Sequence, residues 1–293
     1  MFDDKKMSEP VEIGKGVFWA GFYDKSVDLL CNPYLIVEGD EAVLIDGGSR
    51  PDFPGVMMKI MKTGIMPKNI KVLIYQHYDP DLCGSLPHLE SIIDNPQLKI
   101  LTNKENIRFI KHYGGSVPFE TLDDTGYKFE FKSGRLLEFF NTPYAHTQGS
   151  FITFDHETKI LFTSDIFGSY SNNRQLFLKI DPKCFNCTLE DKCPIDKNFC
   201  HLKNICEFHK GLMTSERALK YAMEVISAIP FEKIAPQHGS ILEDIETTAL
   251  IVKHLRNLKD VGVDAYLKGL SYDKIGNIDP LLKRLELKGQ NIG

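Results

Sequence analysis

The sequence lacks an apolar run long enough to cross a membrane, and it lacks a concentrated patch of one charge. None of its stretches reaches the roughly 18 consecutive apolar residues of a membrane helix. Its N-terminal segment has no apolar core, so we expect no secretory signal and a cytoplasmic protein with reduced thiols. The 35 basic and 40 acidic residues give a net charge of −5, and Lys and Arg form no basic run. Membrane and nucleic-acid partners are therefore not expected.

The 293 residues alternate strand-like and helix-like segments and then change to hairpins. Runs typical of strands occupy 33–37, 42–46, 71–75, 98–102 and 231–235. Amphipathic spacing predicts helices at 53–63, 86–94, 104–112, 214–229 and 244–260. Hairpins are predicted for 127–131 with 136–140 and for 151–154 with 159–163. Strands followed by helices, combined with hairpins, predict an α+β fold of two mixed sheets between helices.

Metal-ligand residues follow the strand predicted at 71–75. On an extended chain, alternate residues point to one side, so His77, Asp79 and Asp81 would present one imidazole and two carboxylates together. Three further candidates, His146, Asp165 and His238, also lie at or after the ends of predicted strands. Each of them alone is more often a turn residue or a cap. Together they predict a metal site, provided that the strand ends gather at one edge of the sheets.

These residues resemble the metallo-β-lactamase fold and, within it, the flavodiiron proteins. The likeness rests on the hairpin that ends at 44–48 and on the loop 77–87, which reads His-x-Asp-x-Asp-Leu-Cys-Gly-Ser-Leu-Pro. The flavodiiron loop reads His-x-Glu-x-Asp-His-Ser-Gly-Ser-Leu-Pro, whereas zinc hydrolases of this fold usually carry His at the position of Asp79. The resemblance covers about 15–260, without the Cys-rich stretch. It implies an αββα sandwich of two mixed sheets flanked by helices.

The resemblance also implies a pair of metal ions. The implied ligands are His77, Asp79 and His146 for the first ion, Asp81 and His238 for the second, and Asp165 shared by both. Leu82 stands where the family has a further histidine ligand, so we expect a weaker or more open second ion. His88, His201 or His209 could substitute, although ordinary packing or surface roles are the better expectation for each.

Iron is the preferred metal, with zinc and manganese as substitutes, since imidazoles and carboxylates suit all three. Two ferrous ions, three carboxylates and a bridging hydroxide would be neutral, and carboxylates favour the ferric state. The resemblance implies that such a pair binds dioxygen as a diferric peroxide. We recognise no flavodoxin domain or FMN phosphate loop in this sequence, so we expect no FMN and an oxygen sensor or binding protein.

Partners and alternative functions follow from the same resemblance. It implies a signalling partner such as a chemotaxis-type receptor, and it is compatible with a homodimer. One alternative is an oxidoreductase, an oxygen or nitric oxide reductase supplied by an external electron donor. The other is a dizinc hydrolase of esters, thioesters or phosphodiesters.

Five of the seven cysteines lie in one segment, about 182–209. They are Cys184, Cys187, Cys193, Cys200 and Cys206. A cluster of this kind in a reducing compartment indicates a metal or redox site. We expect the first four to hold one zinc ion or one iron–sulfur cluster, since Cys-x-x-Cys and Cys-Pro are common in such sites. Free thiols or disulfides are the alternatives.

Three residues beside the ligands have two interpretations each. Tyr78 and Tyr144 could donate hydrogen bonds to a molecule bound at the metals, or they could pack in the core. Cys83 could lie near the second metal, although a small buried residue is the better expectation. We predict that 1–260 form the diiron domain with the Cys-rich insertion, and that 261–293 form a final helix or a tail.

Overall fold

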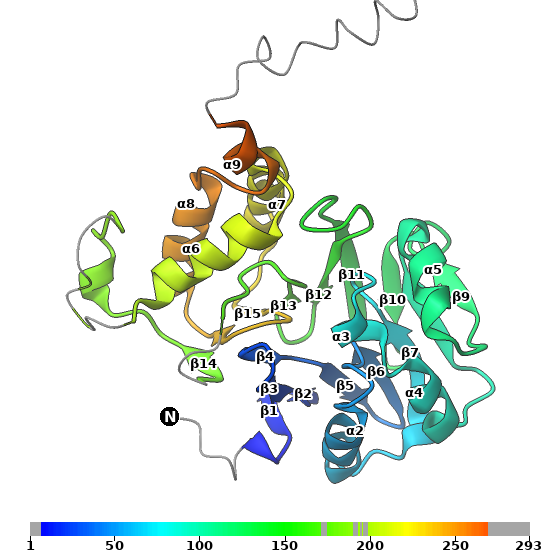
Figure 1. Cartoon of the computed structure of the whole chain (residues 1–293). Helices are drawn as coiled ribbons and strands as arrows, with labels where there is room; N and C mark the ends of the chain where they lie inside the picture. The colour runs from blue at the N-terminus through cyan, green and yellow to red at the C-terminus, as the bar shows by residue number, and fades with distance from the viewer. Residues whose placement is uncertain (1–6, 171–174, 190–192, 194, 196–198, 269–293) are drawn as a thin grey trace, which may run out of the picture.

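Most of the described strands form two seven-stranded mixed sheets that lie between helices, as the computed structural model shows (Figure 1). The structure describes residues 7–170, 175–189, 193, 195 and 199–268. The predicted α+β sandwich of two mixed sheets is therefore confirmed. Among the described residues, none of the helices combines the length and the apolar character that a membrane crossing requires.

The first sheet comes from the first half of the chain, and its strand order is β1-β2-β5-β6-β7-β8-β9. The strands are β1 Val11–Gly14, β2 Val17–Trp19, β5 Tyr34–Glu38, β6 Glu41–Ile45, β7 Ile70–Ile74, β8 Lys99–Thr102 and β9 Phe119–Thr121. Strands β6 to β9 run parallel, which requires crossover connections. These connections contain α2 Phe53–Lys62, η1 Pro67–Asn69, α3 Pro80–Cys83, α4 Leu86–Ile93, α5 Lys104–Ile110 and η2 Lys111–Tyr113.

The second sheet has the strand order β10-β11-β12-β13-β15-β16-β14. The strands are β10 Lys128–Glu130, β11 Leu136–Asn141, β12 Phe151–Asp155, β13 Ile160–Phe162, β14 Phe177–Leu178, β15 Lys233–Ala235 and β16 Ile241–Leu242. The helices of this half are η3 Pro182–Cys184, α6 His201–Leu212, α7 Glu216–Ser227, α8 Ile245–Arg256 and α9 Val263–Leu267. A separate antiparallel pair, β3 Phe22–Asp24 with β4 Leu29–Cys31, joins neither sheet.

One apolar layer fixes the two sheets against each other. Successive side chains of a strand point to opposite faces. In β6, Val43 and Ile45 therefore point into the layer between the sheets, whereas Ala42 and Leu44 point to the helices outside. Because interiors are close-packed, the strand ends at the edge of the sandwich have a rigid base.

One local prediction is wrong. The segment after β7 is not extended as far as Asp81, because Pro80 begins the short helix α3, for which Asp79 is the N-cap.

Within the Cys-rich segment, helix α6 begins at His201. Its buried face includes Leu202, Ile205, Cys206 and His209, which are three or four residues apart or adjacent in the chain.

Candidate metal centre

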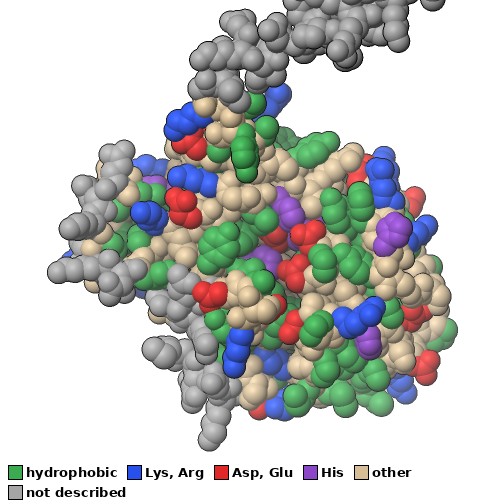
Figure 2. All heavy atoms as spheres, viewed as in Figure 1, with side chains coloured by type: hydrophobic (Ala, Val, Ile, Leu, Met, Phe, Trp, Pro, Cys, Tyr) green, Lys and Arg blue, Asp and Glu red, His purple; other side chains and the backbone are tan. Residues whose placement is uncertain are grey.

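The six predicted ligand residues lie together at one edge of the sandwich. The first sheet supplies, from the loop after β7, His77, Asp79 and Asp81. The second sheet supplies His146 between β11 and β12, Asp165 after β13, and His238 after β15. Strands β13 and β15 are parallel neighbours, so their carboxyl ends meet at the same edge. Figure 2 shows histidine and acidic side chains gathered at the centre of this face.

The first group of ligand atoms is formed by His77, Asp79 and His146. One ligand atom from each lies within 4.8 Å of the other two. Asp79 Oδ2 is 3.7 Å from Nε2 of His77 and 3.4 Å from Nε2 of His146. The two imidazole rings meet edge to face, with centroids 4.9 Å apart. Helix α3 makes this grouping possible, because it turns Asp79 and Asp81 towards different histidines.

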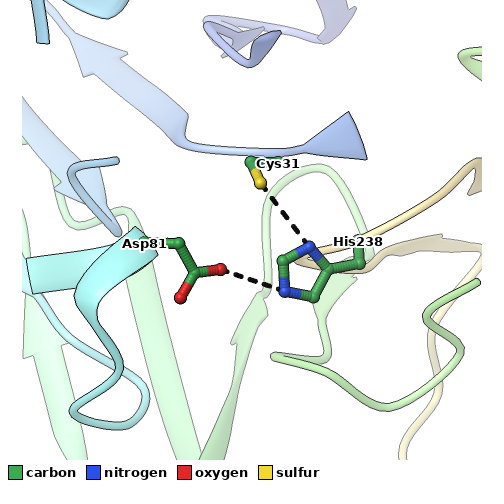
Figure 3. Close-up of side chains that lie close together, drawn as sticks. All are labelled: Cys31, Asp81 and His238. Atoms are coloured by element: carbon green, nitrogen blue, oxygen red, sulfur yellow. Dashed lines mark hydrogen bonds and ion pairs between the residues drawn. The ribbon is translucent and has the colours of Figure 1, made fainter. Parts of the chain in front are cut away.

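The second group contains Asp81, His238 and a residue that was not predicted, Cys31 (Figure 3). Asp81 Oδ2 is 3.1 Å from Nε2 of His238. The sulfur of Cys31 is 3.8 Å from Nδ1 of the same ring. These three residues also offer ligand atoms within 4.8 Å of one another.

Asp165 lies between the two groups and is almost fully buried. Its Oδ2 is 3.0 Å from Nε2 of His146 and 3.7 Å from Nε2 of His77. Its Oδ1 is 3.7 Å from Nε2 of His238. One oxygen therefore faces each group, which is the arrangement of a carboxylate that two metal ions share.

Hydrogen bonds at Nδ1 fix the orientation of two of the imidazoles. Nδ1 of His77 is 2.8 Å from the hydroxyl of Ser164, and Nδ1 of His238 is 3.1 Å from the carbonyl oxygen of Leu30. A proton on Nδ1 that is donated to such an acceptor leaves the Nε2 lone pair for a metal ion. In both residues, Nε2 is the nitrogen that faces the carboxylates.

Opposite charges in the site shift the pKa values strongly. Burial by itself would lower the pKa of His146, but the carboxylates of Asp165 and Asp79 raise it to about 10. The pKa values of His77 and His238 are also raised against the effect of burial, with Asp165 as the largest opposing influence. Burial would raise the pKa of Asp165 and of Asp79, yet the neighbouring imidazoles lower both. These carboxylates are therefore ionised at neutral pH and require compensating positive charge.

Three buried polar atoms of the site have no hydrogen-bond partner. They are Nε2 of His77, Nε2 of His146 and Oδ1 of Asp165. Although His146 Nε2 is close to Asp165 Oδ2, the two groups do not have hydrogen-bond geometry. Buried polar atoms are rarely left unpaired, and imidazole nitrogen and carboxylate oxygen are ligands of iron, manganese and zinc. The donor set fits two metal ions, with Asp165 available to both.

A comparison with protein-family models shows to which family the chain belongs. A family model described as "ODP family beta lactamase" matches residues 29–239, a range that contains all six ligand residues. The chain belongs to this family. The predicted resemblance to the metallo-β-lactamase fold and to flavodiiron proteins is thereby confirmed.

Flavodiiron proteins are among the curated relatives of this ODP-family chain. Flavo-diiron protein FprA2 of Clostridium acetobutylicum is 27% identical over 216 residues, which cover 72% of this chain and 49% of that protein. Diflavin flavoprotein A 1 of a Synechocystis strain is 30% identical over 140 residues, which cover 47% and 24%. The chain spans between 24% and 57% of the length of the curated relatives that it matches.

Solved structures give the same relationship. A structure described as the peroxy diiron species of chemotaxis sensor ODP has a TM-score of 0.69 and 25% identity, and the match covers 90% of this chain and all of that chain. The rubredoxin oxygen:oxidoreductase of Desulfovibrio gigas has a TM-score of 0.69 and 19% identity, and the match covers 85% and 61%. At 19% identity, the match to the Desulfovibrio gigas protein shows that the two chains share a fold.

The ODP-family chain carries leucine where the flavodiiron loop has its additional histidine. Leu82 is fully buried in the apolar cluster outside the first sheet, with Leu86 and Leu89. Its side chain therefore belongs to the core. The second group therefore receives no imidazole from this position.

None of the three histidines considered as substitutes joins the two ligand groups. Both ring nitrogens of buried His209 are in use, since Nδ1 donates to the Ile205 carbonyl at 2.7 Å and Nε2 accepts from the Phe167 amide at 3.0 Å. Burial lowers the pKa of His209 to about 4. His88 packs against Phe53, and His201 packs against Phe199.

Sequence reasoning missed Cys31, the residue that does join the second group. The same rule that found the other ligands could have found it, because Cys31 ends a short strand, β4. That strand is only three residues long and was not recognised. Cys31 and His238 also pair through an isolated antiparallel bridge, which holds the two backbones side by side.

The three residues predicted beside the ligands take different positions. The Tyr78 ring stacks on Phe109, with centroids 4.2 Å apart, and partial burial together with Asp79 raises the pKa of its phenol. The side chain of Tyr144 is half exposed. The buried Cys83 thiol donates to the carbonyl of His77 at 3.5 Å, so it contacts the ligand loop through its backbone.

The Cys-rich segment divides into a thiol group and one core residue. Burial and then the charges of Cys193, Cys200 and Cys187 raise the pKa of Cys184, so these four thiols lie within electrostatic range. Three of them line a pocket of about 300 Å³: Cys184, Cys193 and Cys200. Cys206 belongs to the apolar cluster outside the second sheet. Each of the seven cysteines is described, and they form no disulfide.

Proposed function

We propose that this ODP-family chain binds dioxygen at a pair of iron ions and acts as an oxygen-binding or oxygen-sensing protein. The observation that carries the proposal is the position of Asp165, which turns one carboxylate oxygen to each of two groups of histidine and aspartate. In this proposal, the six predicted ligand residues hold the two ions in the grouping given above. A pair of ferrous ions supplies the electrons that dioxygen accepts on binding.

The protein residues have distinct tasks in this proposal. Ser164 and the carbonyl of Leu30 hold His77 and His238 with Nε2 towards the ions. Asp165 brings negative charge to both positions from a buried place, where it is poorly screened by water. Asp79 and Asp81 are about a third exposed, so the approach of a small molecule is from their side.

The preference for iron rests on the donor set. Asp79 supplies a carboxylate where zinc hydrolases of this fold usually have an imidazole, and carboxylates favour the ferric state. The structural neighbour that is named a chemotaxis sensor in a peroxy diiron state supports both the metal and the ligand. The same name supports a signalling partner of receptor type. That partner, a homodimer and the cytoplasmic location stay predictions.

We propose binding in preference to sustained turnover, and the structural neighbour described as a peroxy diiron species of a chemotaxis sensor supports this preference. We propose that residues 1–260 form the two-iron domain and that 261–293 are an appendage to it. The described part of that appendage contains α9, and residues 269–293 lie outside the described residues.

Exposure of the anaerobically reduced, iron-loaded protein to air tests the proposed function. We expect uptake of one dioxygen per chain and a visible absorption band that persists for minutes or longer, because the site binds oxygen without a continuous electron supply. Metal analysis should find two irons per chain at this site. Oxygen electrode measurements and optical spectra provide the readouts.

Two outcomes would favour the alternatives. Prompt and repeated oxygen or nitric oxide consumption with an added reductant would identify a reductase. A colourless protein that retains only zinc after expression in iron-supplemented medium, and that cleaves a thioester, would identify a hydrolase. The variant Asp79→His tests the preference for iron. It introduces the ligand type that zinc hydrolases of this fold usually have, and it is expected to shift the metal content of the protein towards zinc.

We also propose that Cys184, Cys187, Cys193 and Cys200 bind a zinc ion or an iron–sulfur cluster. The electrostatic influence of the other three thiols on Cys184 supports this, and Cys184, Cys193 and Cys200 line one pocket. We expect one further zinc, or further iron with acid-labile sulfide, beyond the two site metals. Cys184→Ser should remove this extra metal, whereas Cys206→Ser should not. Equal metal and sulfide content in the wild type and Cys184→Ser would contradict the proposal.

A further inference from the structure

We propose that the Cys31 thiolate is a ligand of the second metal ion and replaces the imidazole that is absent at Leu82. The inference rests on the proposed two-metal function and adds a residue to it. Cys31, Asp81 and His238 are one of only two groups in the described part of the chain that bring three ligand atoms within 4.8 Å of one another. The other group is the first metal position itself.

The separations between the ligand atoms of Cys31, Asp81 and His238 are close to those expected around one metal ion. Bonds of about 2.3 Å to sulfur and about 2.1 Å to nitrogen allow two ligands of one ion to be at most about 4.4 Å apart. The three residues bring one ligand atom each within 4.8 Å of one another, which is close to that range. Figure 3 shows the Cys31 sulfur beside Nδ1 of the His238 ring and the Asp81 carboxylate beside Nε2.

The orientation of His238 defines the movement that ligation requires. Its Nδ1 is engaged with the carbonyl of Leu30, so Nε2 is the nitrogen available to the ion. The Cys31 sulfur faces the Nδ1 edge of the ring, 3.8 Å away. Ligation therefore needs a turn of the Cys31 side chain towards Asp81. The bridge between the Cys31 and His238 backbones keeps the thiol beside the ion during this turn.

A buried atom that lacks a partner points independently to an ion at this place. Asp165 Oδ1 is buried, has no hydrogen-bond partner and faces Nε2 of His238 at 3.7 Å. An ion between Asp165, Asp81 and His238 satisfies this oxygen but receives only three protein ligands. The nearby thiol supplies the fourth, which completes the tetrahedral number that is common for first-row ions with sulfur ligands.

Charge balance favours the same assignment. Two divalent ions bring four positive charges, and the three carboxylates compensate three of them. A thiolate at Cys31 compensates the fourth, so the protein alone can neutralise the pair. Neutrality matters because the site is largely buried and an unbalanced charge is costly there.

Cobalt(II) binding to the full chain under anaerobic conditions tests the inference. We expect a thiolate-to-cobalt charge-transfer band in the near ultraviolet for the wild type. Cys31→Ser and Cys31→Ala should each lose the part of this band that accompanies the second ion, with at least about tenfold weaker binding of that ion. Cys83→Ser is the matched control, because that thiol is equally buried and hydrogen-bonds to the His77 backbone carbonyl but belongs to neither ligand group.

The outcomes separate the inference from the function on which it rests. If a second cobalt binds and is lost in Asp81→Ala, but the band and affinity are the same in the wild type and both Cys31 variants, Cys31 is not a ligand and the two-metal function stands. If the wild type takes up no second ion that depends on Asp81, the proposed function itself fails. Far-ultraviolet circular dichroism of both Cys31 variants shows whether a loss reflects unfolding, and agreement between serine and alanine excludes a new serine ligand.

Discussion

Replacement of Asp165 by alanine is expected to remove both metal ions from the site. The Asp165 carboxylate faces both ligand groups, at 3.0 Å from His146 Nε2 and 3.7 Å from His238 Nε2. Its loss leaves the two ions with fewer ligands and less negative charge at the same time. Two like-charged ions close together in a buried site also depend on the anion between them.

Iron content and thermal unfolding measure the effect of Asp165→Ala. Iron analysis after desalting should show two irons fewer per chain than in the wild type. Added ferrous iron should raise the melting temperature of the wild type, because a ligand that binds only the folded state stabilises that state by about 2.7 kcal/mol at 100 times its Kd. The variant should show no such rise.

Two asparagine variants separate ligation from the mere presence of buried charge. Asp165→Asn keeps the shape but loses the charge, and it should behave like Asp165→Ala. Asp46→Asn changes a carboxylate that is equally buried and lies beside the site, where burial raises the pKa to about 7. Asp46 accepts from the Gln76 backbone amide, and the side-chain oxygen of the asparagine variant could still accept this bond, so both ions should remain. Retention of both ions in Asp165→Ala would disprove the shared position.

Replacement of Asp155 by alanine is expected to destabilise the fold by about 3–5 kcal/mol, as removal of one partner of a buried ion pair generally does. Asp155 is fully buried and bonds the guanidinium of Arg135 through both of its oxygens. Arg135 also donates to the Lys15 carbonyl and to Glu38 of the first sheet, so it ties the two sheets together. The variant would leave a buried guanidinium without its main counter-charge.

Denaturant titration and thermal unfolding measure the cost of Asp155→Ala. The expected loss corresponds to a fall of roughly 6–20 °C in melting temperature for a domain of this size. Glu157→Ala is the matched control from the same turn, since Glu157 pairs with Lys15 at the surface. It should leave the melting temperature unchanged within error. An equally small change in Asp155→Ala would mean that the buried pair contributes nothing to stability.

The metal site could be predicted from the sequence because its residues share one local property. Each follows a strand, and strand ends from one sandwich meet at an edge, so pattern alone indicated which side chains could gather. The sorting into groups did not follow from this pattern, and it was the resemblance to flavodiiron proteins that implied it. It depends on helix α3, which turns Asp79 towards His146 and Asp81 towards His238.

Cys31 shows where local reasoning fails. Its strand, β4, is too short to give a recognisable alternation, and its partner His238 is 207 residues away in the chain. Leu82 shows the reverse case, because its identity in the loop predicted a missing ligand but said nothing about which residues stand nearby. Proximity of residues so distant in sequence is set by the packing of two sheets.

The order of polar and apolar residues along the chain indicated the two mixed sheets, the helices that cover them and six candidate ligand residues, and the resemblance to flavodiiron proteins implied that two ions share Asp165. Only the tertiary structure decided that His209 is fully bonded in the core and that Cys31 joins Asp81 and His238. The physical reason is that strand and helix preferences act over a few residues, whereas the geometry of a metal centre depends on contacts between distant segments.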